Sequence, residues 1–282
     1  MSRLRWMVIL ALLLVLSGCG TRFIYNRLDT LARWELESYV SLSETQERFV
    51  RERLAAQLSW HRHTELPRYI AWMQELDTDL ASGIDRAVLD KHFERFYEFR
   101  QALAKHFLPD ITTFLESLSD EQIQELFEAL EEDNQDYADD YVNLPADRLL
   151  KKRMKSMTST LRDWIGTLND SERTLLTGWA REVLLASAEQ LAYQRVWQKE
   201  LREALAYRHD KERFAARMTT LFIEPETLRT PEFQTKVEHN IDRFRTFLVA
   251  LHAGLTDKQR AKLHRQLNDY IEDFTALAAR PD

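Results

Sequence analysis

The sequence is poor in cysteine, glycine and proline: its 282 residues include one cysteine, Cys19, with six glycines and six prolines. One cysteine cannot form an intramolecular disulfide, so the hydrophobic core alone must hold the fold. So few glycines make phosphate-cradling loops hard to build, and neither a P-loop nor a Gly-x-Gly-x-x-Gly pattern occurs. The Gly-x-Ser-x-Gly motif of many hydrolases is also missing. We therefore do not expect an enzyme, and we expect no cofactor in the folded domain.

An excess of basic residues is missing as well. Arg3 and Arg5 precede Cys19, which leaves 37 basic and 46 acidic residues from Cys19 onward, a net charge of −9. Such a balance gives no general electrostatic attraction for nucleic acid. The basic run at residues 151–155 is short and follows an acidic run at residues 131–140, so we expect the two runs to pair. The acidic run lacks the residue order of an EF-hand calcium loop.

No apolar run is long enough to span a membrane. The run over residues 6–16 holds about eleven residues, whereas a transmembrane helix needs roughly 20. Arg3 and Arg5 before this run, and small residues after it, give the pattern of a secretory signal. We therefore predict a signal peptide over residues 1–18 and one helical periplasmic domain over residues 19–282.

The end of this signal, Leu16-Ser17-Gly18-Cys19, resembles the bacterial lipobox. The resemblance implies a diacylglycerol on the sulfur of Cys19, cleavage before it, and an N-linked acyl chain such as palmitate on the new amino group. Several acyl chains on one residue give stable membrane attachment, whereas one chain gives only marginal binding. Gly20 stands where an aspartate would favour the inner membrane, so the outer membrane is the expected location. The alternative is an ordinary secretory signal with a chance cysteine.

Apolar residues recur at helical spacing along the rest of the chain, and no segment alternates with the period of a strand. We predict an all-α fold: a bundle of about eight to ten mostly antiparallel helices without a sheet. Pro67 predicts a kink or break near Glu65, and Pro109 predicts a helix end or kink. A long helix is expected to start after Leu168 and to run past Tyr207.

One helix-start pattern occurs four times, with an apolar residue before the cap and an amide or acid three residues after it. Its cap residues are Ser43, Ser119, Asn169 and Thr256. The Leu-Thr-x-x-Gln form resembles the motif of small helical periplasmic stress chaperones. The alternative is that four helices simply start with the same favourable capping chemistry.

Only one group of residues suggests a metal site. His61, His63 and Glu65 lie close together in the sequence, and His61 and Glu65 are four residues apart, so both would share one face of an α-helix. No zinc-protease motif accompanies them, and a third ligand would have to come from elsewhere. The alternative is that His61 and Arg62 pack near Pro67 while Glu65 pairs with a base.

Three further sequence motifs occur along the chain. They are Tyr25-Asn26-x-Leu28, Trp60-His61-Arg62-x-x-Glu65-Leu66-Pro67-x-Tyr69 and Trp164-Ile165-Gly166-x-Leu168. Together with the lipobox they resemble a domain-of-unknown-function family of helical lipoproteins from gammaproteobacteria. The resemblance covers the chain from Cys19 to about Leu168 and implies fold and compartment but no activity. It marks one possible functional patch, formed by Trp60, His61, Arg62, Glu65, Pro67 and Tyr69.

These observations favour a lipid-anchored cell-envelope protein that binds another envelope protein or serves as a scaffold. Two alternatives remain open: a chaperone-like stress protein, and a metal-binding protein that uses His61, His63 and Glu65. The expected partners are the membrane, through the lipid, and an envelope protein, whereas nucleic acid is not expected. The aromatic segments at residues 60–72 and 93–99 either line a binding groove or belong to the core.

Overall fold

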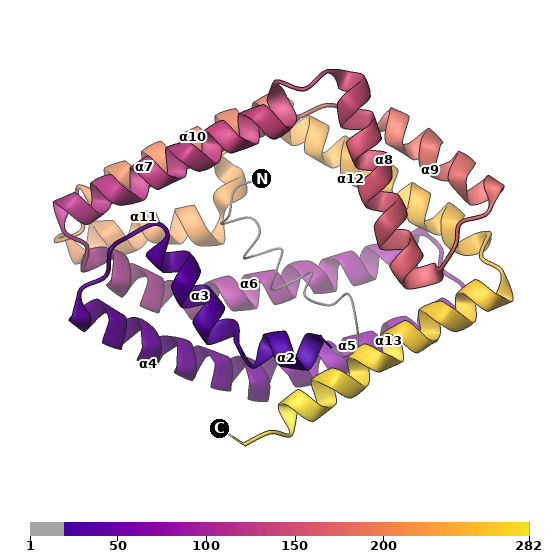
Figure 1. Ribbon diagram of the computed structural model, residues 1–282, viewed down its shortest axis with the longest axis horizontal. Helices are drawn as coiled ribbons and strands as arrows, with labels where there is room; N and C mark the ends of the chain where they lie inside the picture. The colour runs from indigo at the N-terminus through magenta and orange to yellow at the C-terminus, as the bar shows by residue number, and fades with distance from the viewer. Residues whose placement is uncertain (1–19, 282) are drawn as a thin grey trace.

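A computed structural model describes residues 20–281 of the chain, and within that range the only regular structure is helical. The prediction of an all-α bundle is confirmed. The helices follow one another around a ring, with pairs of helices forming its sides (Figure 1). Cys19 and the rest of the predicted signal peptide lie outside the described residues.

The elements alternate between long helices and short turns. In chain order they are α2 (Thr21–Tyr25), α3 (Leu28–Glu37), α4 (Glu44–Trp60), the π-helix η1 (His61–Glu65), α5 (Leu66–Ser82), α6 (Arg86–Glu116), α7 (Asp120–Tyr137), the π-helix η2 (Ala138–Val142), α8 (Ala146–Ile165), α9 (Asp170–Glu182), α10 (Ser187–Leu205), α11 (Lys211–Ile223), the 3-10 helix η3 (Pro225–Leu228), α12 (Pro231–Ala253) and α13 (Asp257–Ala278).

The ring has two halves, α3 to α7 and α8 to α13. The last helix of each half packs against a helix of the other half. Helix α7 ends the first half and packs against α10 of the second, while α13 ends the second half and packs along α5 of the first. Figure 1 places these two pairs on opposite sides of the ring. Helix α6 contacts both α11 and α12 across the halves. Each half is therefore completed by the other.

All four predicted helix starts are confirmed as capping boxes. Ser43, Ser119, Asn169 and Thr256 each accept a hydrogen bond from the amide three residues later, and the side chain at that later position accepts from the cap amide. Each box satisfies two amides that the first turn leaves without a partner in the helix. Asp85 caps α6 with its side chain in the same way.

Two helix boundaries differ from those expected. Of the two outcomes predicted for Pro109, a helix end is excluded, because α6 continues through it to Glu116. The helix after Leu168 does not run past Tyr207, because it ends at Glu182 and a second helix starts at Ser187. In the gap, the Asn240 side chain on α12 accepts from the Leu184 amide and donates to the Leu184 carbonyl. The asparagine thus supplies the bonds that a continued helix would have made.

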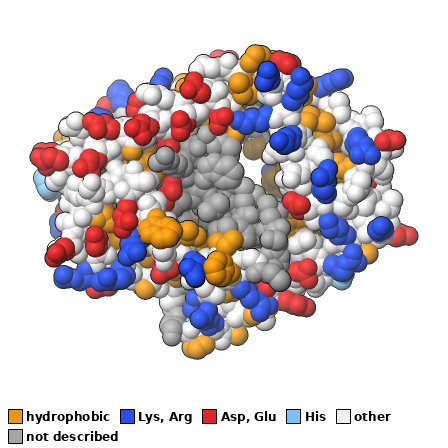
Figure 2. All heavy atoms as spheres, in the orientation of Figure 1, with side chains coloured by type: hydrophobic (Ala, Val, Ile, Leu, Met, Phe, Trp, Pro, Cys, Tyr) orange, Lys and Arg blue, Asp and Glu red, His pale blue; other side chains and the backbone are white. Residues whose placement is uncertain are grey.

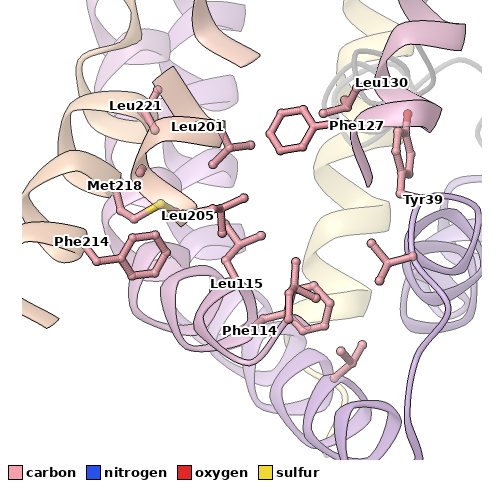
Figure 3. Packing of buried hydrophobic residues seen from close by; sticks show 14 residues of the cluster. Tyr39, Phe114, Leu115, Phe127, Leu130, Leu201, Leu205, Phe214, Met218 and Leu221 are labelled. Carbon is pink, nitrogen blue, oxygen red and sulfur yellow. The ribbon is translucent and has the colours of Figure 1, made fainter. Parts of the chain in front are cut away.

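The hydrophobic core is divided among the sides of the ring. The largest cluster joins α6, α7, α10 and α11 with the segment before α4, and Figure 3 shows Phe127 of α7 directed at Leu201 of α10. A second cluster joins α8, α9 and α12. A third joins α5 to α13 through Met73, Leu267 and Tyr270. Among residues 20–281, no helix is long and apolar enough to cross a membrane.

Candidate functional site

The predicted patch lies on η1 and the first turns of α5, where α2 and α13 meet them. The backbone widens here into a π-helix, and the Leu66 amide donates to the carbonyl of His61, five residues back. Pro67 follows directly and has no amide to donate, so it removes one bond of the regular helix. The predicted disturbance near Glu65 is therefore a π-turn, a distortion that often accompanies functional sites.

His61 is half-buried, and this burial lowers its pKa from 6.5 to about 4, so its imidazole is neutral near pH 7. Burial also raises the pKa of Tyr25, on α2, to about 12, against a smaller opposing effect of Arg62. The Tyr25 hydroxyl and His61 Nδ1 are 2.9 Å apart and share a hydrogen bond, whose direction is set by the tautomer of the ring. The Tyr69 ring packs edge-on against His61, with ring centroids 5.5 Å apart.

Glu65 is a carboxylate inside the protein, with only 1% of its surface exposed. Its Oε1 accepts from Arg68 Nη1 at 2.6 Å, and its Oε2 has no hydrogen-bond partner. Burial, and then the charge of Glu65, hold the pKa of Tyr69 well above its usual range. A buried carboxylate with a single ion pair is costly unless its surroundings are fixed. Glu65 therefore makes the geometry of this turn important for stability.

Helix α2 also contacts this site, through side chains that bind α13 and the start of α5. Arg22 Nε donates to Asp273 Oδ1 of α13 at 2.6 Å, and the Asp273 side chain is buried. Tyr25 packs with Leu66 and Leu277 in a small buried cluster. We call the set formed by Arg22, Tyr25, His61, Glu65 and Asp273 the anchor junction. It joins the first described helix to the last helix of the chain.

The remaining patch residues lie around the anchor junction. Trp60 stacks on His106 of α6, with ring centroids 3.5 Å apart. The Arg62 guanidinium lies over the Tyr25 ring, 5.8 Å from its centroid. Pro67 is exposed. His63 is exposed too, and its Nδ1 is 2.9 Å from the carbonyl oxygen of Ser59.

The three candidate metal ligands are not brought together. The nitrogen His61 Nδ1 is engaged by Tyr25, His63 faces solvent and Glu65 is paired with Arg68. No group of three or more His, Cys, Asp or Glu side chains between residues 20 and 281 has the arrangement to hold a metal ion. The geometry of the described chain thus gives the metal hypothesis no support.

The acidic and basic runs meet at one point, where Lys152 Nζ donates to Asp140 Oδ1 at 3.0 Å. A small hollow on α7 is lined by acidic side chains, including Asp133 and Asp136. The Tyr39 hydroxyl donates to Asp133 Oδ2 at 2.5 Å, so this buried carboxylate is already partnered. The hollow is therefore a satisfied polar contact between α7 and the segment before α4.

The aromatic segments are divided between core and surface. Phe99 is buried and packs edge-on against Tyr69 and Trp72. Phe96 and Tyr97, on the same helix, are exposed. A shallow depression lies beside Tyr97, Phe93 and Arg245. Of the seven aromatic rings in the two segments, one is buried, two are exposed and four are half-buried, so neither interpretation holds for all of them.

The sequence pattern did not reveal that the capping boxes work in pairs. Gln46 and Gln122 exchange hydrogen bonds, with Nε2-to-Oε1 distances of 3.0 and 2.7 Å, and so tie the starts of α4 and α7 together. Glu172 and Gln259 tie α9 to α13 similarly, since Gln259 Nε2 donates to Glu172 Oε2 at 2.9 Å. The sequence signal for this pairing was the amide or acid that recurs three residues after each cap. In the structure that side chain bonds the start of its own helix and also a helix far away in the sequence.

Comparison with known proteins gives one match. The model of a family of unknown function (DUF6279) matches residues 38–234, which include the capping boxes at Ser43, Ser119 and Asn169 and the patch at residues 60–69. No curated protein and no solved structure matches the chain. The match covers well over half of the 282 residues. The chain therefore belongs to the DUF6279 family of unknown function.

Proposed function

We propose that the protein is a lipid-anchored cell-envelope lipoprotein whose helical ring is a non-enzymatic protein-binding or scaffold module. The observation that carries this proposal is the position of Cys19. Only Gly20 separates it from α2, and α2 is held to the ring by the Arg22–Asp273 ion pair and the Tyr25–His61 hydrogen bond. A lipid on Cys19 is thereby attached to the fold with almost no flexible chain between them.

This arrangement favours a positioned domain over a tethered one. A flexible linker would allow the domain to move by roughly 5–6 Å times the square root of its length. With one residue before α2, the ring stays against the membrane that holds the lipid. A protein held in one place and orientation suits a fixed contact with a neighbouring envelope protein.

Acylation is tested by growing cells with an alkyne analogue of palmitate and comparing the full chain with its Cys19→Ala variant. The proposal expects label on the full chain, none on the variant, and release of the full chain from outer membranes by detergent only. A labelled Cys19→Ala protein, or an unlabelled full chain, would overturn it. Separation of inner from outer membranes assigns the location, for which we propose the outer membrane.

The partner is tested by crosslinking in cells followed by mass spectrometry, again with Cys19→Ala as the control. One dominant envelope protein, lost in the control, supports the scaffold or adaptor role. Many unrelated unfolded chains would instead favour a chaperone role. The helix start Leu255-Thr256-x-x-Gln259 supports this second candidate, because this form resembles the motif of stress chaperones.

A further inference from the structure

Two large apolar side chains next to the proposed anchor face solvent. Phe23 on α2 is 60% exposed and Trp34 on α3 is 61% exposed, more than any other large apolar side chain of residues 20–281. No residue of α3 is fully buried. Scattered exposed apolar residues are ordinary, but two aromatic side chains this open on neighbouring short helices leave substantial apolar surface in contact with water.

The two helices that carry these residues lie on one side of the molecule. Figure 1 shows α2 and α3 drawn in front of the helices behind them, across the near face of the ring. On that face, Figure 2 shows hydrophobic side chains gathered over α2 and α3. We call this surface, formed by α2 and α3 with Phe23 and Trp34, the aromatic face.

The distance from Cys19 decides what can cover this face. Phe23 is four residues after Cys19, and a chain spans at most roughly 3.6 Å per residue, so the two α-carbons lie within about 14 Å. Acyl chains on Cys19 must enter the hydrocarbon of a bilayer. The lipid–water boundary then lies within reach of the Phe23 ring, whose neighbour Arg27 places its guanidinium 4.5 Å from the ring centroid.

Charge permits the same contact. The chain from Cys19 onward carries a net charge of −9, which anionic lipid would repel. Residues 20–37 are different, since three arginines (Arg22, Arg27 and Arg33) balance three acidic residues. Tryptophan and arginine are side chains that favour the interface between headgroups and acyl chains. The aromatic face is thus a part of an acidic domain that carries no net charge and lies next to the anchor.

We propose that the aromatic face lies on the lipid surface, with Phe23 and Trp34 inserted at the level of the headgroups. This inference rests on the proposed acylation of Cys19 and adds the orientation of the domain. The ring then presents one fixed face to the membrane and leaves the opposite face open to the periplasm. A free domain on a lipid tether would have no such preference.

The test uses the acylated full chain in vesicles of phosphatidylethanolamine and phosphatidylglycerol whose acyl chains carry bromine, which quenches tryptophan fluorescence at short range. Trp34→Phe is expected to remove most of the bromine-dependent quenching, because Trp34 is the tryptophan at the lipid surface. Trp197→Phe is the matched control. Trp197 is half-buried and donates to the Leu221 carbonyl, so its removal should leave the quenching unchanged. Adding Phe23→Trp to Trp34→Phe should restore the quenching.

The outcomes separate the two proposals. If the chain floats with the vesicles but Trp34→Phe leaves the quenching unchanged, the orientation is wrong and the lipid anchor stands. If the chain does not float, the anchor fails and this inference fails with it. Circular dichroism confirms that each variant remains helical, as expected for substitutions at side chains this exposed.

Discussion

At the scale of single residues, the burial of His61 makes the stability of the fold depend on the protonation state of its ring. The half-buried ring has a pKa of about 4, against 6.5 when exposed in the unfolded chain. Between these values the unfolded chain binds a proton that the folded chain does not. Stability from His61 is therefore fully present above about pH 6.5 and is lost as the pH falls toward 4.

A His61→Gln variant should consequently show a weaker dependence of stability on pH than the native chain. Each unit of pKa difference corresponds to about 1.4 kcal/mol, so the pH-dependent loss due to His61 is at most about 3 kcal/mol. Urea unfolding at pH 7.5 and pH 4.5 measures it, as the change in the free energy of unfolding of each variant. His63→Gln, at an exposed histidine, is the control and should follow the native curve. Equal slopes for His61→Gln and the native chain would contradict the prediction.

The buried carboxylate of Glu65 gives a second prediction. Arg68→Ala removes the ion-pair partner of Glu65 Oε1 and should lower the free energy of unfolding by about 1–3 kcal/mol, because an unpaired charge then remains inside. Combining it with Glu65→Gln removes that charge and should recover part of the loss. A double-mutant cycle by urea denaturation measures both values. If the double variant is no more stable than Arg68→Ala, the loss has another cause.

The sequence identified the patch residues but not what they do. Spacing of four residues predicted that His61 and Glu65 share a face, which holds for 3.6 residues per turn. In the structure, however, the two side chains serve different contacts, since His61 bonds Tyr25 and Glu65 pairs with Arg68. The sequence also contained no sign that Tyr25, 36 positions earlier, would engage His61. Two of the three candidate metal ligands, His61 and Glu65, therefore lie in the anchor junction and bond other residues.

At the scale of helices, the paired capping boxes connect elements that are far apart in the chain. Gln46 and Gln122 are 76 positions apart, and each holds the start of its own helix as well as the other's side chain. Gln46 also donates to the Ser117 carbonyl, and Gln122 donates to the Ser41 carbonyl. Each amide therefore serves both a local and a distant contact.

Replacing both glutamines tests this dual role. Gln46→Ala and Gln122→Ala should each lower stability by about 1–3 kcal/mol, because each removes several hydrogen bonds, worth about 0.5–1.5 kcal/mol apiece. The double variant should lose less than the sum of the two, with a coupling of about 0.5–3 kcal/mol, since the residues contact each other directly. Thermal or urea unfolding of the four proteins gives the cycle. Gln124→Ala, at an exposed position on α7, is the control, and strict additivity would show that the boxes act independently.

Helix starts were easier to predict from sequence than helix ends. The starts carry their own chemistry, an apolar residue, a cap and a third-position amide or acid, all local in sequence. The break after Glu182 carries no glycine or proline and depends on Asn240, 56 positions later. Pro109 misled in the opposite direction, because α6 accommodates it without ending. Local residues decide the first case, and distant contacts decide the other two.

At the scale of the whole molecule, the ring is closed by α13 lying along α5. Leu267 of α13 is buried with Met73 of α5 and Tyr270 in a cluster separate from the largest one. Leu267→Ala should lower stability by about 2–5 kcal/mol, as expected for truncating a buried leucine. Hydrogen exchange should show the largest loss of protection in α5 and α13 together, because each covers the other.

Leu221→Ala is the matched control for this experiment. Leu221 of α11 is equally buried, but in the largest cluster, so its loss of protection should centre on α10 and α11. If both variants lose protection uniformly across the ring, the molecule opens as one unit and the separate clusters do not act as local units. The sequence predicted the helices of this ring but not its closure, since periodicity shows which face is buried and not which helix covers it.

Ring closure also determines the order in which helices can pair during synthesis. Arg22 and Asp273 lie 251 positions apart, so α2 and α5 leave the ribosome long before α13 exists to cover them. Bringing such distant segments together costs loop-closure entropy before any contact repays it, and folds with distant contacts form slowly. The surface of α5 that α13 will cover must therefore stay unpaired during synthesis. A chain that stops before α13 leaves this surface permanently bare, so a protease that recognises it would distinguish unfinished molecules from complete ones.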